Sequence, residues 1–140
     1  MSHGYRRYPH ISGNQVVFVA DDDLWVGETS GGQASRLTRG EDTPRSPRFA
    51  PGGQQIAYVA TTGGGFDLHL ANLDGGSRRL TWLSAGRMQV SGWIDAEHIM
   101  IASSHEAISR GISWLYSVSL DGQIRRLDHG LAMDAAIGRK

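Results

Sequence analysis

The stretch DLHLANLDGGSRRLT, from Asp67 to Thr81, decides the fold, because variants of it occur twice more in the chain. DLWVGETSGGQASRLT precedes it from Asp23 to Thr38, and WLYSVSLDGQIRRL follows from Trp114 to Leu127. Intervals of 43 and 47 residues separate the leucines of the three R-L pairs, which are Leu37, Leu80 and Leu127. A recurrence of this length indicates a repeat architecture built from one supersecondary unit.

A second unit precedes each copy: PHISGNQVVFVA (9–20), RFAPGGQQIAYVA (48–60) and GWIDAEHIMIAS (92–103). We match these units through their alanines, Ala20, Ala60 and Ala102, which are 40 and 42 residues apart. The runs are β-branched or alternating and are bounded by Gly, Asp, Asn and Ser, as expected of short strands joined by tight turns. Gln55–Ala60 is apolar on both faces, which suits a strand covered on both sides. The 19 glycines in 140 residues, roughly twice the ~7% average, fit such turns.

Four short strands in about 40–45 residues are typical of one β-propeller blade. A β-sandwich also has many short strands, but it gives no reason for one turn to recur at a fixed interval. We therefore predict an all-β fold, a partial β-propeller of about three four-stranded antiparallel blades. The expected blades span about 9–38, 46–81 and 88–127, and a fourth begins at about 131–140. A complete propeller has at least four blades, so the length predicts an incomplete ring.

Composition and charge exclude several classes of function. The 14 basic and 14 acidic side chains leave no net charge, which argues against nucleic acid as a partner. The absence of cysteine excludes a disulfide scaffold and a cysteine nucleophile. The longest apolar run, Val16–Ala20, is too short for a membrane helix or a secretory signal. We therefore expect no membrane association and a cytoplasmic location.

Residues with catalytic or ligand-binding chemistry are scattered. The six histidines form no H-x-x-x-H or H-E-x-x-H pattern, so we expect no metal site, and we expect no cofactor. Asp21–Asp23 is either a cation site or a hairpin turn, and we favour the turn. Gly63–Gly65 lacks the helix and the lysine of a phosphate cradle, so we expect a flexible loop. No G-x-S-x-G nucleophile motif occurs.

Aromatic side chains allow two interpretations. They line a recognition surface, or they pack one blade against the next. Trp25 takes the same place in its repeat as His69 and Tyr116 in theirs, which favours packing. The residues concerned are Trp25, Trp82, Trp93, Trp114, Phe18, Phe49 and Tyr58.

The repeats resemble the WD40-like units of the TolB and tricorn group. Ala50-Pro51-Gly52-Gly53 stands where that group usually has a Pro-Asp-Gly turn. The opening resembles the start of tricorn-type proteases in particular, and the resemblance continues almost to the end of the chain. The phrases that carry it are Tyr8-Pro9-His10-Ile11-Ser12-Gly13, Asp22-Asp23-Leu24-Trp25, Arg36-Leu37-Thr38, Arg79-Leu80-Thr81-Trp82 and Val90-Ser91-Gly92-Trp93.

The resemblance implies large cytoplasmic serine peptidases that degrade oligopeptides and assemble as homohexamers. Their first propeller has six blades, a seven-bladed propeller follows, and catalysis lies in later domains. This chain resembles the first three blades, so we expect a scaffold and channel wall that is inactive as an enzyme alone. Its expected partners are an oligopeptide substrate, the remaining domains of a parent chain and further copies in an oligomer.

Two other functions stay open. One is a non-enzymatic TolB-like module for protein–protein interaction, although TolB proteins are periplasmic and begin with a signal peptide that is not seen here. The other is a truncated product without a function of its own. An open reading frame continuing downstream of Lys140 into more repeats and a peptidase domain separates the peptidase from both.

One residue has a specific candidate role. In tricorn-type proteases, the stretch that matches Ser84-Ala85-Gly86-Arg87-Met88 carries basic residues that anchor the C-terminal carboxylate of a bound peptide. The resemblance therefore implies that Arg87 binds substrate, whereas Gly86 takes the place of the second basic residue. A guanidinium suits this task because its planar fork binds a carboxylate bidentately and keeps its charge. The alternative is an ordinary loop arginine at the entry to a strand.

Overall fold

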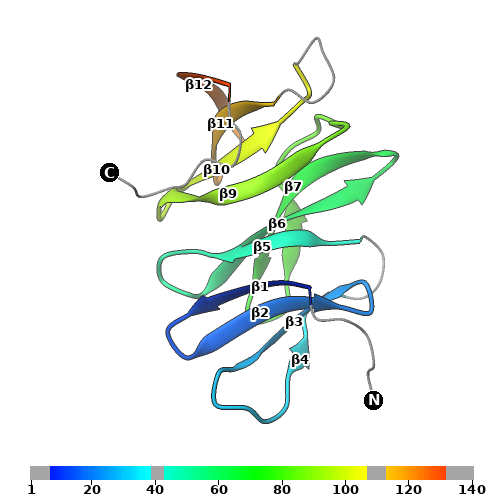
Figure 1. Ribbon diagram of the computed structural model, residues 1–140, viewed down its shortest axis with the longest axis vertical. Coiled ribbons are helices and arrows are strands. Elements are labelled where there is room, and N and C mark those ends of the chain that lie inside the picture. Colours follow the sequence, from blue (N-terminus) through cyan, green and yellow to red (C-terminus); the bar gives the residue numbers. More distant parts are fainter. Residues whose placement is uncertain (1–6, 39–42, 107–112, 132–140) are drawn as a thin grey trace.

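The computed structural model describes residues 7–38, 43–106 and 113–131, and every regular element among them is a strand (Figure 1). The strands form three four-stranded antiparallel sheets in which consecutive strands are neighbours, which confirms the predicted fold class. The first sheet contains β1 (Arg7–Ser12), β2 (Gln15–Ala20), β3 (Asp23–Glu28) and β4 (Ser35–Arg36). The second contains β5 (Arg45–Phe49), β6 (Gln55–Thr62), β7 (Gly65–Asn72) and β8 (Ser77–Arg79). The third contains β9 (Met88–Asp95), β10 (His98–Ser103), β11 (Trp114–Ser119) and β12 (Ile124–Leu131).

The sheet boundaries differ from the expected blades mainly at the C-terminal side. β12 continues past Leu127 to Leu131, so Leu131 is part of the third sheet rather than the start of a fourth. Residues 132–140, where we placed the start of a fourth blade, lie outside the described part of the chain.

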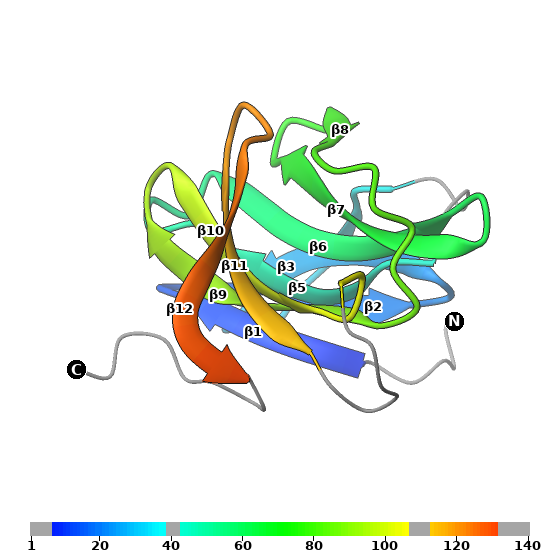
Figure 2. The same cartoon turned by 90° about the horizontal axis from the view of Figure 1, so that it is seen from above.

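The sheets follow one another along the longest axis of the molecule (Figure 1). Their first strands, β1, β5 and β9, contact one another in that order. Both views show these strands running in the same direction across the stack, so their starts lie on the same side of it (Figures 1 and 2). Successive sheets repeat one unit without reversing it, as blades of a propeller do.

Two apolar clusters fill the spaces between the sheets. Ile56 and Tyr58 of β6 pack with residues of the first sheet, including Val17 and Leu24. Alternate residues of the same strand contribute to the cluster shared with the third sheet. Because successive side chains of a strand point to opposite faces, β6 is covered on both sides, as predicted.

The strand pairing corrects the register that we inferred for the third repeat. Ala20 pairs with Asp23 and Ala60 pairs with Asp67, but the corresponding partner of Trp114 is Ser103. Ser103, and not Ala102, is therefore equivalent to the two alanines, which makes the intervals 40 and 43 residues. A shift of one residue moves a side chain to the other face of its sheet, and Ala102 packs away from the second sheet in a cluster with Leu115.

Two sequence features become tight turns. Asp21 and Asp22 have φ values of 52° and 65° and connect β2 to β3. Asp23 is not part of this turn, because it begins β3 and is fully buried. Gly63 and Gly64, with φ values of 67° and 102°, form a two-residue hairpin turn rather than the expected flexible loop.

The outer face of the first sheet leaves an apolar residue exposed. Ile11, Phe49 and Trp93 occupy equivalent positions, because they pair with Val16, Ile56 and Ile99 respectively. Phe49 and Trp93 are 5% and 8% exposed, since a preceding sheet covers them, whereas Ile11 is 61% exposed. Among the described residues, no sheet covers Ile11.

We expect this 140-residue chain to associate with itself in solution through its uncovered sheet faces. The apparent mass from size-exclusion chromatography with light scattering should rise with concentration, and Ile11→Ser should reduce that rise. Ile124→Ser, which changes an exposed isoleucine on the outer strand β12, is the matched control and should have little effect. A wild-type chain that stays monomeric and melts cooperatively would contradict this expectation.

A histidine between the first two sheets predicts acid sensitivity. The Phe49 amide donates to His10 Nδ1 at 3.0 Å, and burial, with a smaller effect of Arg48, lowers the pKa of His10 below its usual 6.5. The unfolded chain therefore takes up a proton more readily, so stability should fall as the pH drops below about 6.5. His10→Gln keeps an acceptor without a titration and should flatten this dependence in melting curves between pH 7.5 and 5.5. An unchanged slope would exclude His10 as a source of it.

Candidate functional site

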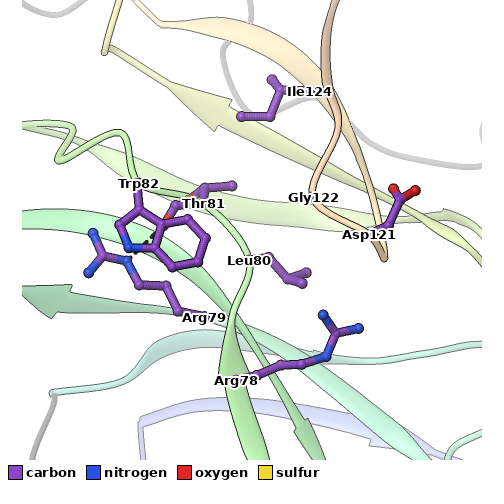
Figure 3. A pocket seen from close by; sticks show the side chains of 8 residues that line it. All are labelled: Arg78, Arg79, Leu80, Thr81, Trp82, Asp121, Gly122 and Ile124. Carbon is purple, nitrogen blue, oxygen red and sulfur yellow. Dashed lines mark hydrogen bonds between the residues drawn. The ribbon is translucent and has the colours of Figure 1, made fainter.

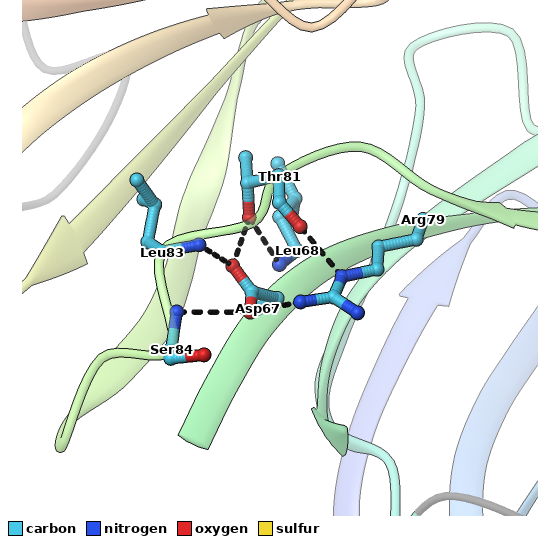
Figure 4. Close-up of polar contacts among 6 residues, drawn as sticks. All are labelled: Asp67, Leu68, Arg79, Thr81, Leu83 and Ser84. Atoms are coloured by element: carbon cyan, nitrogen blue, oxygen red, sulfur yellow. Dashed lines mark hydrogen bonds and ion pairs between the residues drawn. The ribbon is translucent and has the colours of Figure 1, made fainter. Parts of the chain in front are cut away.

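The buried carboxylate of Asp67 is the centre of an extensive polar network (Figure 4). Its Oδ1 accepts from the Thr81 hydroxyl at 2.7 Å and from the Leu83 amide at 2.5 Å. Its Oδ2 accepts from the Arg79 guanidinium at 2.9 Å and from the Ser84 amide at 3.0 Å. The Thr81 hydroxyl also accepts from the Leu68 amide at 3.0 Å, so the network around this one anion joins the start of β7, the end of β8 and the segment that follows.

The first sheet repeats this arrangement. The Thr38 hydroxyl donates to Asp23 Oδ1 at 2.5 Å and accepts from the Leu24 amide at 3.0 Å. Arg36 forms an ion pair with Asp23 Oδ2 at 2.8 Å. The recurring D-L and R-L-T residues therefore form the same polar network in both sheets. The repeats contain this pattern, but the sequence predicted only a turn at Asp23.

The third sheet uses the same arginine position differently. Trp114 stands where the other repeats have aspartate, and the guanidinium of Arg126 lies 4.5 Å from its ring centroid. Arg126 also lies 3.7 Å from Glu106 Oε1, which accepts from the Tyr116 hydroxyl at 2.8 Å. Burial, followed by this hydrogen bond, raises the pKa of Tyr116. A cation–π contact thus replaces the buried carboxylate.

Asp67 holds the segment that carries the candidate residue Arg87. This segment leaves the edge strand β8, passes Asp67 and continues into β9 (Figure 4). Ser84 adopts a left-handed φ of 48°, and a Cβ added at Gly65 would lie 2.5 Å from the Ser84 backbone. Glycine at 65 is therefore needed for the close approach, and the paired amides and carbonyls of Phe66 and Ala85 fix it at 2.8 and 3.0 Å.

Arg87 lies at the entry to β9 with an exposed side chain. Its backbone is held on both sides by Ser104: the Arg87 amide donates to Ser104 Oγ at 3.0 Å, and the Ser104 amide donates to the Arg87 carbonyl at 3.0 Å. The guanidinium makes no hydrogen bond or ion pair with any other residue that the structure describes. Arg87 thus has a restrained backbone and a guanidinium that no described residue pairs with.

A serine–histidine contact nearby does not form a nucleophile. Ser103 Oγ lies 2.8 Å from His105 Nδ1, which is within reach for proton transfer. Ser103 is fully buried, however, and its Oγ also accepts from the His105 amide at 3.2 Å. The contact closes a local turn, and burial lowers the pKa of the His105 imidazole, which packs 4.6 Å from the Tyr116 ring.

A hollow of about 280 Å³ lies between the segment around β8 of the second sheet and the β11–β12 turn of the third (Figure 3). Trp82 is 70% exposed beside it, with the Arg79 guanidinium 4.9 Å from the centroid of its ring system. Packing between blades, the interpretation that we favoured for the aromatic residues, is thus correct for Phe49, Tyr58 and Trp93 but wrong for Trp82. The hollow is lined by Arg78, Arg79, Leu80, Thr81, Trp82, Asp121, Gly122 and Ile124.

In ranges 7–38, 43–106 and 113–131, no group of three or more histidine, aspartate or glutamate side chains is arranged to hold a metal ion. The same ranges contain no helix that is long and apolar enough to cross a membrane.

Residues 3–140 match the family model described as the tricorn protease N-terminal β-propeller domain. The chain is 34% identical over 136 residues to Tricorn protease homolog 1 of Streptomyces coelicolor, covering 96% of this chain and 13% of that protein. It superimposes on the crystal structure of the tricorn protease with a TM-score of 0.78 and 26% identity, covering 91% of this chain and 13% of the other. TolB from Acinetobacter baumannii is similar in fold, with a TM-score of 0.72, 16% identity, and 89% and 32% coverage.

Removal of the Asp67 carboxylate should destabilise the chain strongly. Asp67→Ala leaves the Arg79 guanidinium and the Leu83 and Ser84 amides without their acceptor, so we expect a loss of about 3 kcal/mol in the free energy of unfolding. Asp74→Ala, in an exposed turn, is the control and should cost less than about 0.5 kcal/mol. Urea denaturation measures both, and equal effects would show that the network contributes little.

Proposed function

Because this chain belongs to the tricorn protease N-terminal β-propeller family, we propose that it forms part of the first propeller of an oligopeptide-degrading serine peptidase. In this proposal the three sheets serve as a scaffold and as part of the wall of a substrate channel. The parent protein is cytoplasmic and homohexameric, and its catalytic groups lie in other domains. The chain spans about an eighth of the length of the Streptomyces relative, which agrees with a contribution to only part of such an enzyme.

The proposed role in substrate binding rests on Arg87, which combines a restrained backbone with an exposed, unpaired guanidinium. Two hydrogen bonds to Ser104 hold the Arg87 backbone in place at the entry to β9. Its guanidinium remains available, since no described residue pairs with it. We assign Arg87 to the C-terminal carboxylate of a bound peptide, because a guanidinium fork and a carboxylate form two parallel hydrogen bonds.

The TolB-like alternative has weaker support. The similarity to TolB at 16% identity concerns the fold alone, whereas the family match covers residues 3–140. A propeller that docks a protein partner requires no unpaired cation at the entry to β9. We therefore keep the peptidase propeller as the proposed function.

The proposal predicts selective binding without cleavage. The chain should bind a fluorescein-labelled tetra-alanine peptide with a free C-terminal carboxylate more tightly than the same peptide amidated at its C-terminus. Arg87→Ala should remove most of this difference because the cation is lost, while mass spectrometry should show both peptides intact. Equal affinity of the wild-type chain for the two peptides at low ionic strength would refute the carboxylate anchor.

A further inference from the structure

A second arginine, Arg45, is linked to the segment that carries Arg87 through its neighbours, although 42 residues separate the two in the sequence. We propose that Arg45 supplies a second guanidinium to the carboxylate site at Arg87. This inference rests on the proposed function, and it names a residue to act in place of the basic neighbour that Gly86 does not provide. Two structural connections join Arg45 to the segment that carries Arg87.

The first connection runs between the first strands of the second and third sheets. β5 begins at Arg45, and the hydroxyl of the next residue, Ser46, accepts from the Val90 amide of β9 at 3.2 Å. Arg87 comes three residues before Val90, and three residues of extended chain span about 10 Å. Since β5 and β9 run in the same direction across the stack, the start of β5 at Arg45 and the residue before β9, Arg87, lie on the same side of the stack (Figure 2).

The second connection runs through Phe66. The Arg45 guanidinium carbon lies 4.8 Å from the centroid of the Phe66 ring. Phe66 in turn exchanges two backbone hydrogen bonds with Ala85, at 2.8 and 3.0 Å. Ala85 is two residues before Arg87, so the residue whose ring contacts Arg45 is hydrogen-bonded through its backbone to the segment that carries Arg87. The contact with Phe66 restricts the Arg45 side chain and leaves its hydrogen-bond donors available.

The local charge favours an anion at this place. Arg45 and Arg87 are both exposed, and neither forms an ion pair with a residue in the described part of the chain. Asp67, the buried carboxylate of the adjoining network, already accepts from Arg79, Thr81 and two amides. A peptide carboxylate has two oxygens with about four acceptor positions, so it can accept from two guanidinium groups at once. Arg45 and Arg87 are therefore complementary to one C-terminal carboxylate.

The experiment compares the affinity of single variants for the free-acid and amidated tetra-alanine peptides by fluorescence anisotropy at low ionic strength. Arg45→Gln should reduce the ratio of the two affinities about fivefold, as expected for a partly solvated ion pair, and should leave binding of the amide unchanged. Arg45→Lys should retain part of the preference, because it keeps the charge but loses the planar fork. Arg125→Gln, which removes an exposed arginine of β12, is the matched control and should leave the ratio as in the wild type.

The outcomes separate this inference from the proposed function. A preference that Arg87→Gln reduces and Arg45→Gln leaves intact would overturn the role of Arg45 and keep the anchor at Arg87. A wild-type chain without any preference would overturn the anchor itself. Equal weakening of acid and amide by Arg45→Gln would show a structural role and would also overturn the inference. Less than additive effects in the double variant would support one shared carboxylate.

Discussion

The structure depends on a buried carboxylate that joins each of the first two sheets to the chain leaving it. In the second sheet, Asp67 accepts hydrogen bonds from a side chain of the edge strand and from two amides beyond it. Burial of a charge is unfavourable unless its hydrogen bonds are satisfied, so this network fixes the course of the segment that follows. Asp23 repeats the ion pair and the threonine contact in the first sheet.

The same network connects the fold with the proposed binding site at Arg87. The segment held by Asp67 passes Gly65, where the absence of a side chain allows the Ser84 backbone to approach. It then reaches Arg87, the residue before β9. The third sheet has no buried carboxylate at the equivalent position, and the contact of Arg126 with Trp114 replaces it. The network of Asp67 thus restrains the chain where it approaches the candidate binding residue. A restrained backbone reduces the conformational freedom that Arg87 would lose on binding, which supports the proposed anionic ligand.

Several features of the fold could be predicted because they arise from local rules that the repeat multiplies. Tight turns such as Asp21–Asp22 follow from residue types that tolerate a positive φ, and three copies of the unit made the sheets recognisable. The register of the third repeat could not be predicted reliably, since Ala102 and Ser103 are both small and adjacent. Only the pairing of Ser103 with Trp114 distinguishes them. The exposed Trp82 was missed because its surroundings come from a neighbouring sheet.

By itself, the sequence determined the all-β repeat architecture, the number of sheets and the place of Arg87 before a strand, because periodicity and turn chemistry are properties of the linear chain. The tertiary structure decided the role of Asp23 and Asp67, whose partners lie 12 or more residues away. It also brought Arg45 to the segment of Arg87, through Ser46 with Val90 and Phe66 with Ala85. Such contacts depend on how one sheet is placed against the next, and sheet packing involves side chains that are distant in the sequence.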